Sequence, residues 1–444
     1  MDSSQSTEGS AGTSDVPAAP AASAPAVEPS PGRRGWRRWA MDTRPLRHPP
    51  FRRLWSSTIV TAVGSQLTAV AVPKQIFDIT GSSAWVGYAS LAGLVPLVVF
   101  ALWGGAIADS MDRRKLLLIT NCGIAGTSLL FWAQAIAGLG SVAVLMALLA
   151  LQQAFFGLNS PARTASIARL VPADELPAAN ALSSTVMQTG LVAGPLLAGA
   201  LIPVIGLPEL YLIDAVALCA TVWAVFRLPS LPPLGGSSAV RRAGWRQIAE
   251  GFRYMSRRRV LLLSFLADII AMVFGMPRAL FPQLASQTFA PYGQGLALGL
   301  LYAAIPIGAV VGGLFSGTFS RAGRHGLMVI GAVVAWGLAV AVSGLSGNLW
   351  IAVACLAAAG VADMVSMVFR GAILLSAATD EMRGRMQGVF TVVVAGGPRL
   401  ADVLHGTSGS ALGPRATVAG GGLLVVVIML ALAAALPELR RYRI

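Results

Sequence analysis

Charged residues inside long apolar stretches are the most informative feature of this sequence, because ionisable groups are costly there and usually serve a function. The clearest set is Arg399, Asp402 and His405, which follow one another at three-residue intervals. This spacing places the side chains along one broad face of a helix. An aspartate beside an arginine stays ionised, yet it can take up a proton when the pair separates. For Asp402 the set indicates either proton coupling or a structural ion pair, and His405 alone is also typical of a packed polar residue.

Five further ionisable residues occupy other apolar stretches, and one of them, Asp214, lies near the start of its stretch and is expected to have a structural role. Asp363 and Arg370 are seven residues apart and therefore share one helical face. Arg370 has a counterpart in Arg163, close to the end of an earlier stretch, and this favours a gate or a structural role over contact with a ligand. Asp268 and Arg278 are about 15 Å apart along one helix, so each must find its partner on another element.

The composition identifies the solvent around these charges. Of the 444 residues, 55% are hydrophobic and 12% are charged, and the mean hydropathy is +0.70. Soluble domains carry about 25% charged residues, so lipid must surround most of this chain. The formal net charge of +14 does not indicate nucleic-acid binding, because the basic residues fall in short clusters between apolar stretches.

Twelve apolar stretches follow one another, most of them near the ~20 residues that a membrane-spanning helix needs. We therefore predict an all-α membrane protein with twelve transmembrane helices in two pseudo-symmetric six-helix bundles. The predicted spans are 54–73, 84–108, 116–138, 141–162, 177–205, 209–226, 260–284, 295–319, 326–345, 349–375, 386–411 and 416–437.

Basic residues predict the orientation of these spans. Most of the 33 Lys and Arg residues lie in alternate loops and at the two chain ends, whereas Lys74 and Arg415 are the bases of the other loops. Basic loops stay in the cytoplasm, so both termini are expected there. The first apolar stretch follows Arg52-Arg53 and is too long for a signal peptide.

Composition also divides the chain into four segments. Residues 1–48 are rich in Ala, Ser, Pro and Gly and are expected to be a disordered cytoplasmic tail. Residues 49–228 and 260–444 form the two six-helix halves. Residues 229–259 are a basic linker whose apolar residues predict a helix on the cytoplasmic leaflet, with a regulatory or partner site as the alternative. That apolar stripe consists of Trp245, Ile248, Phe252 and Met255.

The two halves also repeat at an offset of about 206 residues. Arg163 precedes Asp174-Glu175, and Arg370 precedes Asp380-Glu381 at nearly the same distance. Matched halves of this kind predict a substrate path between them, near the middle of the bilayer.

One loop of the first half carries a family resemblance. The segment Gly105-x-x-x-Asp109-x-x-Asp112-Arg113-Arg114 resembles the signature loop of the major facilitator superfamily, with Asp112 where the family usually has Gly. The resemblance implies that Gly105 permits close helix contact and that Asp109 and the arginines form a latch on the cytoplasmic side. The alternative is a loop that serves orientation alone.

A second motif points to export. The segment Gly190-x-x-x-Gly194-Pro195-x-x-Ala198-Gly199 resembles the antiporter motif of the same superfamily, and the resemblance implies efflux. Ordinary helix packing through small residues is the alternative. Gln153 stands where many proton-coupled members carry an arginine, so this position is not expected to carry a proton.

Further segments look like the enterobactin exporter branch of the superfamily: Val70–Ile76, Ala279–Ala285, Leu301–Gly317 and Glu438–Arg443. The resemblance implies a bacterial inner-membrane exporter of a siderophore or a similar small molecule by alternating access. A broad drug or macrolide pump is the alternative within transport. A transporter-like sensor or a membrane-embedded lipid enzyme is the alternative from another class.

These observations fix the expected site and partners. The coupling carboxylate is expected to be Asp402, then Asp363 or Asp268, and the coupling ion a proton. Arg399, His405, Gln153 and Arg278 are expected along the substrate cavity. No enzyme activity, cofactor, metal or nucleic acid is expected, because Walker motifs are absent and the three cysteines lack metal spacing. The partners are a small-molecule substrate and the lipid bilayer, and the protein is expected to be a monomer.

Overall fold

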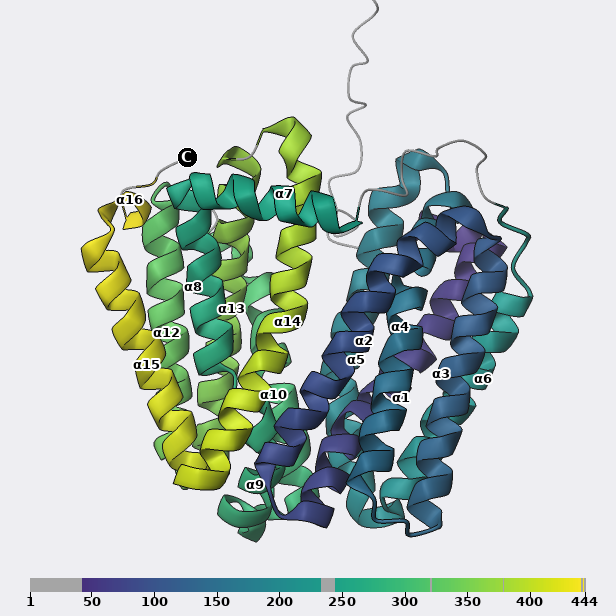
Figure 1. Ribbon diagram of the computed structural model, residues 1–444, viewed down its shortest axis with the longest axis horizontal. Coiled ribbons are helices and arrows are strands. Elements are labelled where there is room, and N and C mark those ends of the chain that lie inside the picture. Colours follow the sequence, from purple (N-terminus) through teal and green to yellow (C-terminus); the bar gives the residue numbers. More distant parts are fainter. Residues whose placement is uncertain (1–41, 233–243, 320–321, 378, 441, 443–444) are drawn as a thin grey trace, which may run out of the picture. The chain divides into compact units, whose positions relative to one another are not determined.

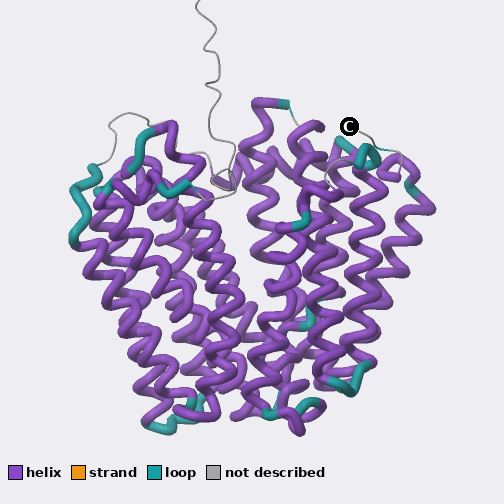
Figure 2. Tube along the Cα trace, turned by 180° about the vertical axis from the view of Figure 1, so that it is seen from behind, coloured by secondary structure: helices purple, strands orange, loops and turns teal. Residues whose placement is uncertain are grey.

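The computed structural model describes residues 42–444 apart from 233–243, 320–321, 378, 441 and 443–444. Every regular element of the described residues is a helix, and the loops gather at two opposite ends of the helices (Figures 1 and 2). Most of the tail expected at 1–48 lies outside the described residues. Its last part differs from the prediction, because Arg44–Arg47 form a 3-10 helix in which Pro45 is buried.

Six long helices form the N-terminal half. Their bounds are α1 Pro49–Thr80, α2 Ser83–Ser110, α3 Arg113–Ile136, α4 Val142–Leu170, α5 Leu176–Ile205 and α6 Leu207–Phe226. α1 packs against α5 and α6, α2 runs along α4, and α3 contacts α4 and α6. Prolines such as Pro73 and Pro161 lie inside these helices, where neighbouring helices and side chains can compensate the lost hydrogen bonds.

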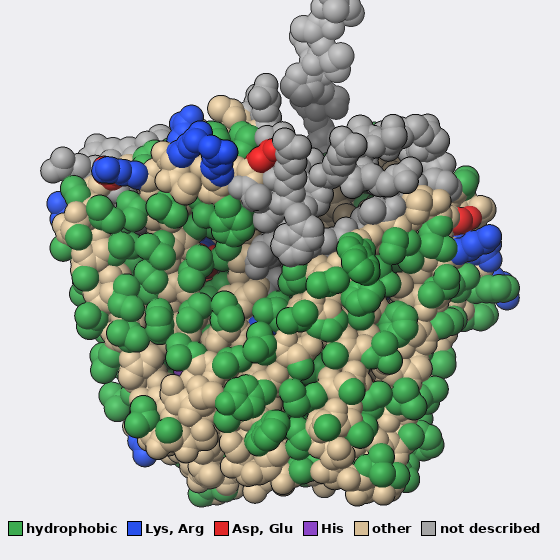
Figure 3. Space-filling view, viewed as in Figure 1, with side chains coloured by type: hydrophobic (Ala, Val, Ile, Leu, Met, Phe, Trp, Pro, Cys, Tyr) green, Lys and Arg blue, Asp and Glu red, His purple; other side chains and the backbone are tan. Residues whose placement is uncertain are grey.

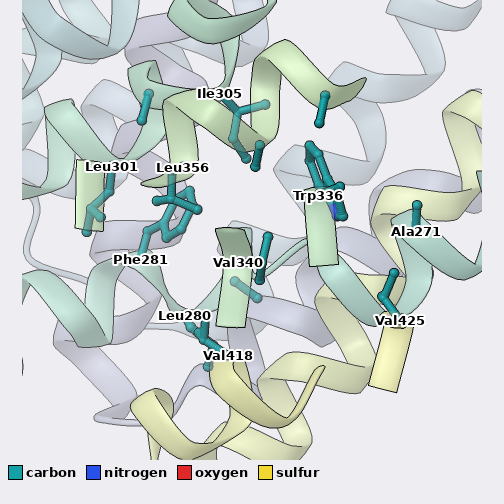
Figure 4. Close-up of a cluster of buried hydrophobic side chains, with 14 of the residues drawn as sticks. Ala271, Leu280, Phe281, Leu301, Ile305, Trp336, Val340, Leu356, Val418 and Val425 are labelled. Carbon is teal, nitrogen blue, oxygen red and sulfur yellow. The ribbon is translucent and has the colours of Figure 1, made fainter. Parts of the chain in front are cut away.

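The C-terminal half repeats this set. Its long helices are α8 Arg259–Gly275, α10 Gln294–Leu314, α12 His325–Leu345, α13 Leu349–Ala377, α14 Asp380–Leu412 and α15 Pro414–Ala435. α12 packs against α13 and α15, and α10 packs against α13. Arg163 and Arg370, which the sequence repeat pairs, lie on α4 and α13, the fourth long helix of each half. The core of this half joins Trp336, Val340, Val418 and Val425 of α12 and α15 (Figure 4).

Two predicted spans are broken in the structure. The stretch 260–284 is not one helix, because α8 ends at Gly275 and the short helices Arg278–Leu280 and α9 (Phe281–Gln283) follow. Gly275 and Pro277 explain the break, since glycine weakens a helix and proline cannot donate the backbone hydrogen bond. The stretch 295–319 likewise ends as a helix at Leu314, and α11 (Ser316–Phe319) follows.

Ten helices of the described residues are long and apolar enough to cross a membrane. α1 and α14 complete the set of twelve, although neither is among those ten helices. α1 carries the charged residues of the Lys74–Asp78 ion pair, and the side chains of α14 are described only in part. Hydrophobic side chains cover the visible sides of the helices (Figure 3). The chain is therefore an all-α membrane protein built of two six-helix groups.

The linker contains the helix α7 (Gly244–Arg257), which lies across one end of the long helices (Figure 1). We call this the α7 end, and the end with the turn at Gly81 the far end. The side chains of Trp245 and Ile248 lie outside the described residues. Met255 is buried in the core of the C-terminal half, whereas Phe252 is 38% exposed. The predicted stripe therefore faces protein at Met255, because α7 packs on α8 and α14.

Candidate functional site

The two halves meet through glycines toward the far end. A side chain on Gly199 of α5 would collide with the backbone of Gly295 and Gly299 of α10. A side chain on Gly87 of α2 would collide with the backbone of Asp402 on α14, and one on Gly406 would collide with Ser83. Such contacts are possible only between helices that approach at backbone distance.

The antiporter-like motif supplies part of this contact. Gly190 and Gly194 face α1 at Ala62 and Gln66, whereas Gly199 faces α10 of the other half. Pro195 is buried, and its carbonyl lies against Gly299. The motif therefore packs α5 on α1 within the half and on α10 across the halves.

Asp402 lies where α14 crosses α2. Its carboxylate is 3% exposed, and its Oδ2 accepts a hydrogen bond of 2.8 Å from the hydroxyl of Ser90 on α2. Arg278 Nη2, just after α8, lies 3.4 Å from the same oxygen. The other oxygen, Oδ1, is buried and has no hydrogen-bond partner among the described residues. Asp402 thus joins the two halves through one oxygen and keeps the other free to bind a proton.

Arg399 makes a second link between the halves. Its Nη2 donates to Oε1 of Gln153 on α4 at 3.1 Å, and its Nη1 donates to the backbone carbonyl of Ser90 at 3.3 Å. Gln153 therefore accepts a hydrogen bond from an arginine of the other half. We call Ser90, Gln153, Arg278, Arg399 and Asp402 the interface cluster.

The break after α8 positions Arg278 in this cluster. Its carbonyl accepts a hydrogen bond of 3.4 Å from the hydroxyl of Tyr302 on α10, and the Tyr302 ring meets Phe281 edge to face. His405 lies one turn beyond Asp402, with both ring nitrogens close to backbone carbonyls of Ala401 and Phe274. His405 therefore touches the wall behind the cluster and not the cavity itself.

A cavity of about 100 Å³ opens beside the cluster. Its walls come from α1, α2, α10, α14 and the segment after α8, and they combine apolar surface with a few polar groups. Sequence reasoning missed Ser90 and Gln66, because a serine or glutamine in an apolar stretch gives no signal by itself. The lining residues are Gln66, Ala69, Val70, Pro73, Val86, Ser90, Arg278, Ala279, Tyr302 and Asp402.

The remaining charges form a separate group inside the C-terminal half. Arg370 of α13 makes an ion pair with Asp268 of α8, and its Nη2 lies 3.8 Å from Asp363 Oδ1 on the same helix. Asp268 and Arg370 are 2% and 6% exposed, whereas Asp363 is 35% exposed. The expectation that Asp268 and Arg278 find partners on other helices matches this geometry. We call Asp268, Asp363 and Arg370 the C-half triad.

The loop between α2 and α3 is held to its own half. Asp112 caps α3 by accepting from the backbone of Arg114, and it also accepts from the hydroxyl of Ser230 and the backbone of Leu231. Partial burial alone would raise the pKa of Asp112, but these hydrogen bonds together lower it below the ordinary value of 3.8. The residue that departs from the family pattern is therefore a helix cap and an anchor for the chain after α6.

The arginines of this end bind carbonyl oxygens. Arg113 donates to Ala165 at 3.1 Å, and Arg114 donates to Phe226 at 2.5 Å. Arg163 donates to the hydroxyl of Thr58 at 3.2 Å. The surroundings of Gly105 and the side chain of Asp109, which the latch prediction needs, lie outside the described residues.

The arrangement can hold a proton and an anion, but its chemistry does not suit a metal. Among the described residues, no group of three or more His, Cys, Asp or Glu side chains could hold a metal ion. The interface cluster combines one carboxylate with two guanidinium groups, and it joins two helix bundles near the middle of the predicted spans. Fold and site together define a transporter of the major facilitator type.

Comparisons with known proteins agree with this class. A family model described as transmembrane secretion effector matches residues 40–442, and the chain belongs to this family of major facilitator transporters. The enterobactin exporter EntS of Citrobacter koseri is 30% identical over 410 residues, which cover 91% of this chain and 96% of that protein. EntS of Escherichia coli O139:H28 is 30% identical over 417 residues with the same coverage.

Solved structures show the same fold. The nucleoside transporter NupG has a TM-score of 0.69 at 13% identity and covers 89% of this chain and 100% of that one. A bacterial homologue of the human lysosomal transporter Spinster has a TM-score of 0.65 at 16% identity, with 89% and 96% covered. The homologues and the fold are those of transporters and not of enzymes, and the protein is a membrane exporter of a small molecule.

Proposed function

We propose that the protein exports a siderophore or a similar small molecule across the bacterial inner membrane by alternating access, in exchange for protons. In this proposal the α7 end and both termini face the cytoplasm, because most basic residues belong to that end. The chain then divides into a cytoplasmic tail (1–48), two transport halves (49–228 and 260–444) and a basic linker (229–259). A monomer contains the complete cavity.

One observation supports the coupling role above all others: Asp402 is a buried carboxylate whose partners come from both halves. Rocking of the halves separates α14 from α2 and thereby removes the hydrogen bond from Ser90. A carboxylate that loses a donor in a medium of low dielectric constant binds a proton more readily. Asp268 and Asp363 are weaker candidates, because their partner Arg370 belongs to the same half.

The glycine contacts support a description of the transport cycle. With the halves in backbone contact at the far end, the cavity is closed toward the outside, and the cargo binds from the cytoplasm. Rocking opens the far end, releases the cargo and lets a proton reach Asp402. Gly105, Asp109, Arg113 and Arg114 would then latch the α7 end, and Arg163 and Arg370 would act at the gates of the two halves.

The relatives support the cargo assignment, because their names state that they export enterobactin. Arg278 lines the cavity and suits an anionic or phenolic cargo there, and Tyr302 offers an aromatic face. Arg399 is not among the lining residues and adds positive charge in the neighbouring interface cluster. His405 and Gln153 act as supports of these arginines in this assignment. The competing assignment, export of macrolides or other drugs, is tested in the same experiment.

The decisive test uses the purified full-length protein in proteoliposomes with an imposed pH gradient. Enterobactin and a macrolide are the probes, and the measured quantity is cargo accumulated against its gradient. We expect the wild type to concentrate enterobactin and the Asp402→Asn variant to lose at least tenfold of this activity. An unchanged rate in Asp402→Asn would overturn the coupling assignment, and accumulation of the macrolide alone would overturn the siderophore assignment.

Asp214→Asn is the matched control. Asp214 is as deeply buried as Asp402 and also accepts hydrogen bonds from hydroxyl groups, those of Thr68 and Ser128. All of these partners belong to the N-terminal half, so its loss should not affect coupling to the pH gradient. A similar loss of uptake in both variants would show that burial, and not position between the halves, explains the effect.

A further inference from the structure

His405, which the transport proposal treats only as a support, has an unusual environment. The side chain is 2% exposed and is enclosed by α8, α14 and α15. Its Nδ1 lies 3.0 Å from the carbonyl oxygen of Ala401, one turn earlier on α14. Its Nε2 lies 3.1 Å from the carbonyl oxygen of Phe274, in the last turn of α8. Both ring nitrogens therefore face hydrogen-bond acceptors.

The Phe274 carbonyl belongs to the break in α8. The last carbonyls of a helix have no donor farther along the chain, and α8 ends at Gly275 before Pro277. A buried carbonyl without a donor costs free energy, so the imidazole of His405 supplies what the interrupted helix cannot. The break that His405 stabilises places Arg278 beside Asp402.

The packing of α15 at Gly421 also leaves room for the His405 ring. A side chain on Gly421 would lie 2.9 Å from the His405 Nε2 atom and would collide with the Phe274 carbonyl. A glycine at this point of α15 therefore leaves just enough space for the imidazole to reach α8. The contact joins three helices of the C-terminal half at the point where one of them is interrupted.

Hydrogen-bond chemistry makes this contact sensitive to protons. A neutral imidazole has one N–H, so it can donate to one of the two carbonyls and turns a lone pair toward the other. An imidazolium ion has two N–H groups and satisfies both. Only the imidazolium can therefore bind the Phe274 carbonyl at the break and the Ala401 carbonyl of its own helix at the same time, whereas the neutral ring has one N–H to divide between them.

We propose that His405 is a positioning residue that clamps the α8 break and that the clamp is complete only when the ring is doubly protonated. This inference rests on the proposed function in one respect, because the Arg278–Asp402 contact that it controls is the proposed coupling site. Loss of the second proton leaves the ring one N–H to divide between the Ala401 and Phe274 carbonyls, so the Phe274 bond is no longer always present, the break loosens, and Arg278 is free to leave Asp402. Proton binding at two linked groups would then govern one transition.

The charged groups around His405 set the conditions for this titration. Asp402 and Arg399 lie on its own helix, and Arg278 follows α8. Farther along α8, Asp268 is paired with Arg370 of α13, and α15 presents Gly421 to the ring.

The first experiment reads the ring directly in the wild-type protein. The sequence holds 3 histidines, so ¹⁵N-histidine labelling gives three imidazole signals that His48→Gln and His325→Gln variants assign. We expect both His405 nitrogens to be protonated at the acidic end of a titration from about pH 5 to pH 8, and one to lose its proton within it. A ring that stays neutral, or stays charged, over the whole range would overturn the inference.

The second experiment measures the break by hydrogen exchange of the peptide covering residues 274–282. Exchange in the wild type and in His405→Asn is compared at the same pH, so that the intrinsic rate cancels. We expect the wild type to exchange roughly fivefold more slowly than the variant at pH 5, which is the effect of about one hydrogen bond. The ratio of the variant's exchange rate to that of the wild type should fall toward one as the pH rises to 8. A ratio independent of pH would indicate a structural role alone and would refute the clamp.

His325→Asn is the matched control for this comparison. His325 begins α12, and its ring contacts Phe369 and the carbonyl of Gly323. Its replacement should leave exchange at 274–282 unchanged. Neither readout requires transport, so a proton-sensitive clamp without proton-driven export would refute the proposed function alone. If His405→Asn does not fold, the titration of the His405 ring in the wild-type protein still tests whether the clamp gains a second proton.

Discussion

The two halves share a helix order but treat their charges differently. In the N-terminal half, Asp214 is held by two hydroxyl groups, and Arg163 is held by the hydroxyl of Thr58. In the C-terminal half, the corresponding arginine, Arg370, is paired with a buried aspartate, Asp268. At this pair of matching arginines, the N-terminal half thus offers a hydroxyl group where the C-terminal half offers a carboxylate.

The fifth helix of each half shows the same difference. α5 of the N-terminal half packs through Gly190, Gly194 and Gly199, whereas α14 of the C-terminal half carries Arg399 and Asp402. The first helices differ as well, because α1 continues through Pro73 and α8 breaks before Pro277. The comparison indicates that the N-terminal half supplies packing surfaces and the C-terminal half supplies the titratable groups.

The largest effect should come from Arg370→Ala. Removing this side chain leaves Asp268 buried without its cation, and such a loss costs about 3–5 kcal/mol of stability. Arg163→Ala removes one hydrogen bond to a hydroxyl and should cost about 1 kcal/mol. Thermal unfolding in detergent measures both. Equal losses in the two variants would contradict the asymmetry between the halves.

A smaller effect on stability, but a clear effect on transport, is expected for Gly199→Val. The added side chain would collide with the backbone of α10 and hold the halves apart at the far end, so export should fall roughly tenfold, about 1.4 kcal/mol. Cysteine cross-linking across α5 and α10 and cargo flux measure the two parts of this prediction. Gly126→Val is the control, because nothing lies within 4 Å of a side chain there.

The smallest effect is expected for Asp112→Ala at the α7 end. Loss of an N-cap costs about 0.5–2 kcal/mol, here together with the anchor to Ser230 and Leu231. Because the pKa of Asp112 is lower in the folded protein than its ordinary 3.8, its contribution is complete above that value and fades as the pH falls through the folded pKa. The stability difference between wild type and variant should therefore shrink from pH 7 toward pH 3. A difference that grows on acidification would argue against the capping role.

Sequence patterns were sufficient for the helices but not for their interruptions. Each long helix follows an apolar stretch of suitable length, and the charges inside those stretches marked Asp402, Arg399 and Asp268 as important. The break at Gly275 could not be predicted, because Pro73 and Pro195 lie inside helices that continue past them. At the break in α8, Gly275 and Pro277 act together, and the carbonyl of Phe274 lies 3.1 Å from the ring of His405 on α14.

The partners of the charged residues were also beyond sequence reasoning. Arg278 could have met any acid of the bundle, and its contact with Asp402 depends on where α8 ends. Ser90 gave no signal, and Gln153 stood out only as a departure from the superfamily pattern, since the contacts of both arise from helices that are far apart in the chain. Composition fixes which groups need partners, whereas the packing of the halves decides which partners they find.

The contact of Gly199 with Gly295 and Gly299 has a mechanical consequence. Main chain rests on main chain there, so the surfaces can part without any side chain changing its rotamer or giving up an interlocked position. Separating α5 from α10 at these glycines therefore exposes little apolar side-chain area and should meet only a low energy barrier. In the proposed transport cycle, this contact can therefore open and close in every turnover without side-chain rearrangement.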